Sequence, residues 1–507
     1  MSPTQQRAVW LIHTNRFHGR LPPLLALRGI QVTYVCTSPV EAFADEAGCT
    51  LHSAWDAMAG KGPVGADADV PPPDSELLRA MREHELVTLF MMARLNYEGF
   101  RPYEVRSIYL KYVAYWHRAL AARRPSAVVF LVTPHMGFDY VLYALCKLLG
   151  VRTLVIERTF ISDRLVMLEG IHDIPAPPAA IFDDDLSPRL EVAEVTPLRS
   201  DVRSYYEVRD RRFVTPDPAP TRAALMRAVM KHAFRSVRQQ LAQLPSLHLQ
   251  HRDSIYVLSY ALRGRTPSKA AHAWHSLRDG IAMEHVRWRY QRAACQPDFS
   301  QDYVYFSLNY QPEKSTIPLA GDFADQISAL DLLVDALPQG WTIYVKEHPR
   351  QFWDPSRFRL ARGHRFYRAL QRHGDKVQLV PTSVPSGDLI AHARCVATPT
   401  GSAGWEAVNA GVPALVFGTP WYMHCPGVRS LSSRRDCHEA LADVASGRLA
   451  VVPRALVRYR EWLVSSATFA GYFEDTFEPM SALSPQANAE SFATAIASRL
   501  ALESTHV

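Results

Sequence analysis

The chain has 507 residues, which is more than a single hydrophobic core ordinarily organises, so we expect two domains or more. Hydrophobic residues make up 48% and charged residues 21% of it, which is typical of a soluble globular protein. The formal net charge of +6 is modest for this length, so it favours anionic partners without requiring nucleic acid, and we expect no nucleic-acid partner.

The cysteines and the N-terminus indicate the compartment. Seven cysteines are spread singly, with no Cys-x-x-Cys pair, which argues against a disulfide framework or a zinc site and fits a reducing cytosol. The first residues lack the apolar core of a signal peptide, and no apolar run is long enough to span a bilayer. We therefore expect a cytoplasmic location, with any contact with the inner membrane being peripheral.

The first part of the chain alternates strand and helix patterns, which predicts a doubly wound α/β domain. A stretch rich in Gly, Pro and Asp near residues 60–75 predicts a surface loop. A second β-α-β unit follows a mainly helical stretch and has polar residues at both strand ends. Strands are predicted at 8–13, 31–36, 127–132 and 152–157, and helices at 21–28, within 75–123 and at 140–149.

The pattern changes between about residues 221 and 296, where strand signals weaken and long, arginine-rich helical patterns appear. We interpret this stretch as a helical insertion or hinge. From residue 302 the alternation of strands and helices returns, which predicts a second doubly wound domain. The predicted boundaries are 1–215 for an N-terminal domain, 216–300 for the insertion, 301–475 for a C-terminal domain and 476–507 for a terminal helix.

A short apolar strand in the second domain ends in Lys346-Glu347-His348-Pro349. Pro349 cannot continue a β-ladder and biases His348 towards an extended backbone. Ligands of open α/β sheets bind at the carboxyl ends of the strands, so we expect Lys346 and His348 to meet an anionic group. The alternative is a structural histidine and a solvated lysine at a strand end.

A second signal, from Val396 to Ala407, has the pattern of a strand, a turn rich in hydroxyls and glycine, and a helix. Glycines let a backbone approach a ligand closely, and a helix N-terminus offers N–H groups to an anion. Together with His348, this turn is predicted to hold a phosphate. An ordinary turn with an N-cap serine is the alternative. The predicted phosphate-binding residues of the turn are Thr400, Gly401, Ser402, Ala403 and Gly404.

A third run, Tyr303 to Thr316, contains Gln311-Pro312-Glu313 and is followed by Gly321-Asp322-Phe323. In series with the two signals above, it resembles the capsule and surface polysaccharide biosynthesis glycosyltransferases, closest to the β-Kdo transferases of capsule linkers and O-antigens. The resemblance is clearest over residues 300–430 and weaker over 134–164. The His-Pro pair also resembles that of bacterial sialyltransferases, where the histidine meets the phosphate of CMP.

The resemblance implies a fold and a reaction. The fold is GT-B, with two Rossmann-like domains facing across a cleft, and the donor is CMP-Kdo, used with retention of anomeric configuration. It implies no cofactor and no required metal ion, and a surface polysaccharide or glycolipid, such as capsule or lipopolysaccharide, as acceptor. In GT-B enzymes a glutamate early in such a helix commonly meets the ribose, which is the role expected for Glu406.

A retaining double displacement needs one carboxylate as nucleophile and an acid/base group for the acceptor hydroxyl. Glu313, directly after a strand, is the expected donor-side carboxylate, with Asp322 as the next candidate. Glu157, at a strand end in the opposite domain, is the expected base or acceptor-binding group. Asp139 and Asp325 are further candidates, and a capping or salt-bridged role is as well supported for each carboxylate. The expected substrate-binding residues are His135, Arg158, Arg164 and Gln311.

Other acidic and basic patterns carry less weight. The aspartates at 67–69 lie in the predicted surface loop and those at 183–185 in a solvated turn, so no metal site is predicted. The arginine-rich helices suit a contact with anionic lipid, although an ordinary solvated face is favoured. Two other functions stay open: transfer from another donor (CMP-sialic acid, a CDP-polyol or a UDP-sugar) on the same fold, and a non-catalytic polysaccharide-binding subunit of an export complex.

Overall fold

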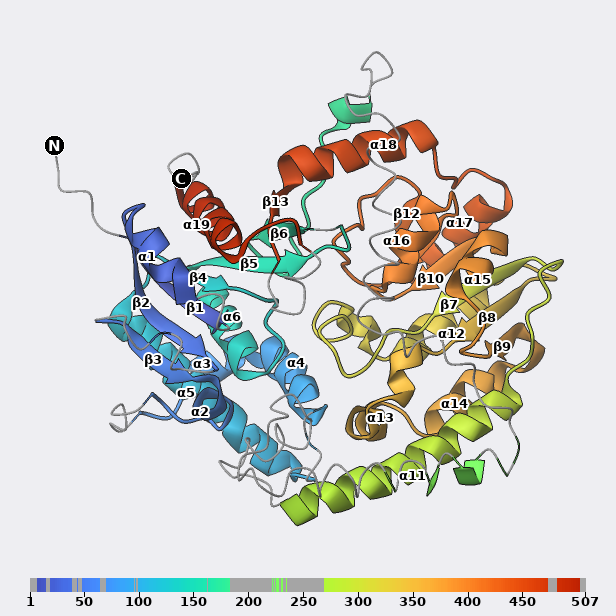
Figure 1. Cartoon of the computed structure of the whole chain (residues 1–507), viewed down its shortest axis with the longest axis horizontal. Helices are drawn as coiled ribbons and strands as arrows, with labels where there is room; N and C mark the ends of the chain where they lie inside the picture. The colour runs from blue at the N-terminus through green and yellow to red at the C-terminus, as the bar shows by residue number, and fades with distance from the viewer. Residues whose placement is uncertain are drawn as a thin grey trace.

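The computed structural model describes residues 7–14, 19–38, 48–63, 70–94, 99–161, 163–182, 269–472 and 481–501, with residues 43 and 96 and a few residues between 221 and 234. The aspartates at 67–69 and 183–185 and most of the predicted insertion before residue 269 lie outside these ranges. Two sheet domains stand side by side (Figure 1).

The first domain is built on a seven-stranded sheet in the order β13-β6-β5-β4-β1-β2-β3. Strands β1 to β5 are parallel, whereas β6 runs antiparallel to β5 and β13 antiparallel to β6. The strands are β1 (Arg7–Thr14), β2 (Ile30–Thr37), β3 (Thr50–Ser53), β4 (Ala127–Phe130), β5 (Arg152–Arg158), β6 (Arg164–Leu168) and β13 (Thr468–Ala470).

Side chains alternate between the two faces of this sheet along each strand, and both faces are buried in apolar clusters. Trp10 and Phe130 face one apolar cluster, shared with the helices α5 and α6, while Val9 and Val129 face another, shared with α1 and α19. The helices that follow the first strands are α1 (Leu21–Ala26), α2 (Ala54–Met58), α3 (Ser75–Ala80), α4 (Arg82–Ala93), α5 (Pro102–Arg123) and α6 (Phe138–Leu148), with a 3-10 turn η3 (Ala179–Phe182).

The second domain has six parallel strands in the order β12-β11-β10-β7-β8-β9. Numbered from β7, this is the order of a Rossmann fold, with its topological switch point between β7 and β10. The predicted α/β class and GT-B architecture are therefore confirmed. The strands are β7 (Tyr303–Ser307), β8 (Thr342–Lys346), β9 (Val377–Val380), β10 (Cys395–Thr398), β11 (Ala414–Val416) and β12 (Val428–Ser430).

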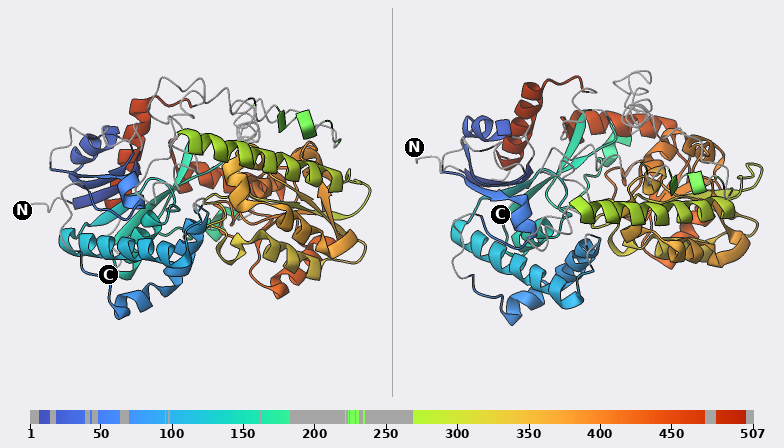
Figure 2. Two further views of the ribbon diagram at one scale, coloured as in Figure 1. Left: turned by 90° about the horizontal axis from the view of Figure 1, so that it is seen from below. Right: turned by 60° about the horizontal axis from the view of Figure 1, so that its bottom comes forward.

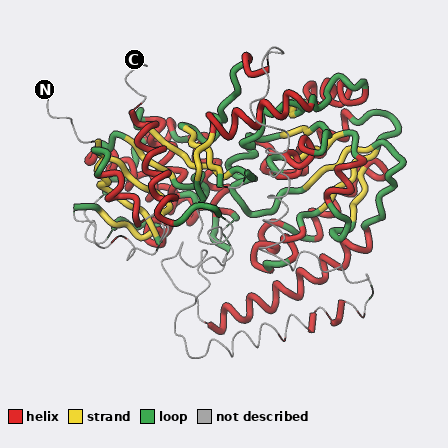
Figure 3. Tube along the Cα trace, turned by 45° about the horizontal axis from the view of Figure 1, so that its top comes forward, coloured by secondary structure: helices red, strands yellow, loops and turns green. Residues whose placement is uncertain are grey.

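Helices cover the second sheet on both faces (Figures 1 and 3). Met283 and Tyr290 of α11 pack into the core of this domain, so the last part of the predicted insertion belongs to it. The helices are α11 (Lys269–Ala293), α12 (Gln326–Ala336), α13 (Pro355–Ala361), α14 (His364–Leu370), α15 (Ser386–His392), α16 (Ser402–Asn409) and α17 (Arg434–Ala445), with the short turns η5 (Gly321–Ala324), η6 (Pro349–Phe352) and η7 (Gln371–Lys376).

The chain returns to the first domain near its end, through α18 (Pro453–Trp462), η8 (Leu463–Ala467), β13 and α19 (Pro485–Ala501). Thr468–Ala470 pairs with β6, although the sequence interpretation assigned residues up to 475 to the C-terminal domain. Strand β13 has only three residues, which is too short to be predicted from the sequence, and it forms by pairing with β6, which is distant in the chain. The terminal helix packs on α1, where Arg28 donates to Thr494 (3.1 Å).

A buried charged network fixes the end of β8. The Glu347 side chain is fully buried and accepts hydrogen bonds from Arg362 Nε (2.6 Å) and Tyr367 Oη (2.7 Å). Its Oε1 also accepts the backbone N–H of His348 (2.8 Å). The network therefore holds the backbone of the residue after the strand in a single position, because a buried carboxylate is costly without its partners.

We expect Arg362→Ala to destabilise the protein by about 3–5 kcal/mol, because it leaves the Glu347 carboxylate buried and without its cation. The midpoint of urea denaturation, followed by tryptophan fluorescence, measures this. Arg394→Ala is the matched control, since Arg394 and Asp302 form an exposed pair worth no more than about 1 kcal/mol. Equal midpoints for the two variants would contradict the role given to the Glu347 network.

Candidate functional site

The carboxyl ends of β8, β7 and β10 form one edge of the second sheet. Ser307 pairs with Lys346 and Phe306 with Ala397, so the three strands end at the same level. The segments that follow them carry His348, Asn309-Tyr310 and the turn 398–404. The two signals read from the sequence therefore lie at one edge, with the segment after β7 between them.

His348 has a defined tautomer. Its backbone is extended (φ −64°, ψ 124°), as predicted from Pro349, and the residue caps η6. The N–H of Arg350 donates to His348 Nδ1 (3.2 Å), so in the neutral ring the proton is on Nε2. Among the described residues, Nε2 makes no hydrogen bond. His348 therefore presents an N–H donor.

Positive charge surrounds His348. Burial, followed by the charges of Arg350, Lys346 and Arg362, lowers the pKa of His348 to about 3. Its ring lies 5.6 Å from the ring of Tyr310, and the guanidinium groups of Arg350 and Arg357 lie 5.5 and 5.7 Å from the same tyrosine ring. The edge is thus electropositive around a neutral imidazole, which suits an anionic ligand.

Lys346 is bonded within the chain. It is only 4% exposed, and its Nζ donates to Val384 O (2.5 Å) and Ser386 Oγ (3.0 Å). These bonds tie the ammonium group to the segment after β9. Two of the three N–H donors of Lys346 are thus used within the chain, and its contact with a phosphate stays a prediction.

The hydroxyls of the turn after β10 are engaged by the chain itself. Thr400 Oγ1 accepts from Asn309 Nδ2 (2.9 Å) and donates to Ser315 O. Thr398 Oγ1 donates to Asn309 Oδ1 (2.9 Å) and accepts from Gly401 N (3.1 Å). The threonines thus anchor the segment after β7. Asn309, which the sequence analysis missed, joins the two loops.

The two glycines of the turn serve packing rather than ligand approach. A Cβ on Gly401 would stand 2.7 Å from Thr398 Oγ1, and one on Gly404 would stand 2.5 Å from Tyr422 Oη. We predicted that these glycines let a ligand approach, but the space beside them is filled by Thr398 and Tyr422. The N–H groups of Ser402 and Ala403 remain in the first turn of α16, where no preceding helical carbonyl faces them.

Glu406 lies one turn into α16. It accepts a hydrogen bond from Ser402 Oγ (2.9 Å), and burial raises its pKa while Ser402 and Lys346 lower it. The Ser402 hydroxyl is therefore also engaged. Glu406 shares the sheet edge with His348, so its predicted contact with a ribose stays a prediction.

Glu157 joins the two domains. It ends β5 in the first domain, is 7% exposed, and forms an ion pair with Lys314 from the segment after β7. Thr133 donates a hydrogen bond to its other oxygen. The carboxylate predicted for the acceptor side thus stands at the junction of the two domains, with a cation as partner.

Asp139 is placed as a structural carboxylate. It is fully buried and accepts the backbone N–H groups of His135 (2.8 Å), Met136 (2.8 Å) and Tyr140 (2.7 Å) at the start of α6. These bonds shape the turn after β4. The structure therefore corrects the prediction that Asp139 is catalytic.

The donor-side candidates are exposed. Glu313 accepts from Ser315 Oγ (3.1 Å), and Asp322 lies exposed in η5. Asp325 caps α12 by accepting from Ile327 N (3.1 Å). Gln311 is bonded on both sides: its Nε2 donates to Ala324 O (3.1 Å) and its Oε1 accepts from Arg362. Gln311 thus holds the loop that presents Glu313.

The remaining predicted substrate residues lie at the domain junction or near it. His135 Nδ1 donates to Thr133 O (2.7 Å), so Nε2 carries the lone pair of the ring. The guanidinium group of Arg158 lies 5.5 Å from the ring of Phe160, and Arg164 begins β6 beside it, since Arg158 pairs with Leu165.

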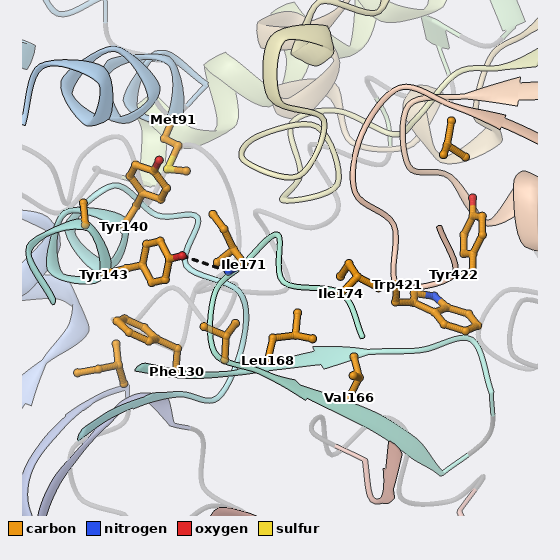
Figure 4. Packing of buried hydrophobic residues seen from close by; sticks show 14 of the residues in the cluster. Met91, Phe130, Tyr140, Tyr143, Val166, Leu168, Ile171, Ile174, Trp421 and Tyr422 are labelled. Atoms are coloured by element: carbon orange, nitrogen blue, oxygen red, sulfur yellow. Dashed lines mark hydrogen bonds between the residues drawn. The ribbon is translucent and has the colours of Figure 1, made fainter. Parts of the chain in front are cut away.

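Apolar side chains also cross the junction. Phe160 lies 6.4 Å from Trp421 between ring centroids, and one buried cluster contains residues of both domains. Figure 4 shows Ile174 next to Trp421, and Tyr143 Oη accepting the N–H of Ile171 (3.1 Å). Trp421 and Tyr422 are therefore packing residues.

Polar contacts missed by the sequence analysis complete the junction. Arg94, at the end of α4, donates to Ile317 O (3.0 Å) of the second domain and to His135 O of the first. His172 Nδ1 lies 2.7 Å from Thr419 Oγ1. Arg94 lies outside any motif, and Lys314 lies in the run Tyr303 to Thr316 without a predicted role, so only their distant partners identify them.

Two further features are absent from the part of the chain that the structure describes. No group of three or more His, Cys, Asp or Glu side chains there is arranged to hold a metal ion. No helix in the described ranges has the length and apolarity needed to cross a membrane.

Solved structures resemble the chain only weakly. The β-Kdo 2,7-transferase of KpsC from Thermosulfurimonas dismutans is 12% identical, with a TM-score of 0.31, over 78% of this chain and 98% of that one. The β-Kdo 2,4-transferase of the same protein is 12% identical (TM-score 0.29, 69% and 82%). UDP-GlcNAc 2-epimerase from Neisseria meningitidis bound to UDP-GlcNAc is 10% identical (TM-score 0.23, 98% and 99%). These values are too low to support an inference about function.

A comparison with curated proteins gives no match. The family model described as capsule polysaccharide biosynthesis protein matches residues 289–440. The match begins near the end of α11, ends within α17, and includes the edge that carries His348 and the turn 398–404. The residues that match this family model, 289–440, include all six strands of the second sheet.

Proposed function

We propose that the protein is a glycosyltransferase of capsule or related surface polysaccharide synthesis, which transfers a sugar from a nucleotide donor to a glycan or glycolipid acceptor. The observation that carries this proposal is the electropositive edge of the second sheet, where the Nε2–H of His348 and the first turn of α16 flank the segment Asn309-Tyr310. An edge at the switch point of a Rossmann fold is a usual place for a nucleotide.

The donor we propose is CMP-Kdo, used with retention. His348 donates its Nε2–H to the phosphate, and the N–H groups of Ser402 and Ala403 receive another phosphate oxygen. A neutral donor beside Arg350 and Arg357 lets a CMP leaving group be stabilised without a proton transfer from the protein. A CMP-sialic acid, CDP or UDP donor uses the same edge and is the alternative.

The transfer requires two displacements for retention. A carboxylate, Glu313 or Asp322, attacks the anomeric carbon while the bond to CMP breaks and CMP leaves with the electron pair. The acceptor hydroxyl then attacks the same carbon, releases the carboxylate and gives its proton to a base. Glu157, at the junction, is the base we propose, and Arg158 and Arg164 bind the carboxylate of the sugar or an anionic acceptor.

His348→Ala is expected to weaken CMP binding about ten- to a hundredfold, because it removes one hydrogen bond to a charged phosphate. Isothermal titration calorimetry with CMP measures the loss. His392→Ala is the matched control, since His392 is an exposed histidine at the end of α15. Equal affinities for the wild type and His348→Ala would exclude the role of this imidazole.

The pH dependence distinguishes a neutral donor from a cationic histidine. Because the pKa of His348 lies at about 3, far below its ordinary 6.5, the ring of the free protein stays neutral between pH 5.5 and 7.5. The ratio of the CMP affinities of the wild type and His348→Asn should therefore stay constant over this interval. Ionisation of CMP itself affects both proteins equally and so does not change the ratio. A ratio that rises about tenfold as the pH falls would show that the ring binds phosphate as a cation.

The carboxylates are tested by their amides. Glu157→Gln and either Glu313→Gln or Asp322→Asn should lower the release of CMP from CMP-Kdo, in the presence of a glycan acceptor, by about 10²–10⁴-fold while CMP binding is kept. Glu439→Gln, on the exposed face of α17, is the control. Wild-type turnover in both the Glu313 and Asp322 variants would refute the donor-side assignment.

The choice of nucleotide has its own test. A ligand that binds only the native state raises the melting temperature, so CMP should raise it more than CDP, UDP or GDP at equal concentration. A larger shift with UDP would replace the proposed donor. The absence of any shift, together with tolerance of the carboxylate variants, would support a non-catalytic polysaccharide-binding subunit.

A further inference from the structure

The exposed arginines of the second domain fall into two groups. Those of the first group form ion pairs with carboxylates, for example Arg372 with Asp331, Arg394 with Asp302, and Arg434 with Asp335. Those of the second group lie on α11 and α14 and, among the described residues, pair with no carboxylate. The second group comprises Arg289, Arg292, Arg365 and Arg368.

The unpaired arginines are held close to one another. Arg289 and Arg368, from different helices, both donate to Nε2 of the exposed His364, at 2.7 and 2.9 Å. Desolvation, together with the charges of Arg289, Arg368 and His285, lowers the pKa of His364, so the ring stays a neutral acceptor. Two guanidinium charges therefore converge on one point of the surface, and no carboxylate of the described residues pairs with either of them.

Apolar side chains occur on the same face of α11. Trp274 is 62% exposed and Ile281 is 40% exposed. Positions 274, 281, 285, 289 and 292 recur at helical spacing, opposite the buried Met283 and Tyr290. From Trp274 to Arg292 the face extends about 27 Å at 1.5 Å per residue. The helix runs along the outer edge of the second domain (Figures 1 and 2).

We propose that this face, formed by Trp274, Ile281, Arg289, Arg292, Arg365 and Arg368, binds the surface of a membrane that contains anionic phospholipids. Four arginines that pair with no carboxylate in the described part of the chain are complementary to anionic headgroups. The exposed Trp274 and Ile281, which precede the arginines on α11, fit the boundary between headgroups and acyl chains, where amphipathic helices lie. A soluble polyanion such as nucleic acid would contact the arginines but not these two apolar side chains, so the membrane accounts for more of the face.

The proposal does not depend on the donor or on catalysis, because membrane binding is measured without either. Full-length protein is sedimented with vesicles of phosphatidylcholine alone, and with vesicles in which one lipid in three is phosphatidylglycerol. We expect binding to the anionic vesicles only, and weaker binding as salt is added.

The charge-reversed variant Arg289→Glu/Arg368→Glu should bind the anionic vesicles at least about tenfold more weakly. Arg82→Glu/Lys111→Glu on the first domain has the same change in net charge and should bind like the wild type. Trp274→Ala should bind more weakly but keep the salt dependence. Melting temperatures verify that each variant is folded.

Three results would overturn the proposal. The first is equal binding by the wild type and the Arg289→Glu/Arg368→Glu variant. The second is equal binding of the wild type to both kinds of vesicle. The third is tight binding of soluble polyphosphate or of short duplex DNA without binding to vesicles, which would assign the face to a soluble polyanion.

Discussion

The ion pair between Glu347 and Arg362 is the interaction on which the candidate site depends. Glu347 directly follows β8, and its fully buried carboxylate accepts hydrogen bonds from Arg362 and Tyr367. The buried carboxylate also binds the backbone N–H of His348. The buried Glu347 carboxylate is stable only with its hydrogen-bond partners, and one of these partners is the backbone N–H of His348. This requirement fixes the backbone position of His348.

The junction between the domains applies the same principle to the other side of the site. Glu157 of the first domain is paired with Lys314 of the second, and Arg94 binds carbonyl groups of both. The segment after β7 carries Lys314, Ile317 and Glu313, so one segment links the edge of the second sheet that carries His348 to the first domain. In the proposed reaction, the donor-side and acceptor-side carboxylates are therefore positioned by a shared set of contacts.

Much of the fold was predictable from the sequence because it depends on local patterns. Apolar strands that alternate with helices predict both Rossmann domains, and Pro349 predicts the extended backbone of His348. The short strand β13 was missed because three residues acquire their strand only by pairing with β6. The arrangement of His348 and the turn 398–404 at one edge followed from the rule that parallel strands end at the same edge.

The roles of individual polar side chains were less predictable, because a sequence does not show which partners occupy them. Lys346 and Thr400 have the residue types of a phosphate site, but their polar groups are bound by Ser386 and Asn309. Gly401 and Gly404 make room for Thr398 and Tyr422. The sequence predicts no role for Asn309 or Arg362, although both hold the site together, because their partners are distant in the chain.

The central claim is that a nucleotide phosphate binds between the imidazole of His348 and the first turn of α16. A crystal structure of the protein with bound CMP tests it most directly. We predict a phosphate oxygen within hydrogen-bonding distance of His348 Nε2 and another facing the N–H groups of Ser402 and Ala403. A cytidine monophosphate bound elsewhere, with His348 Nε2 facing solvent, would contradict the account.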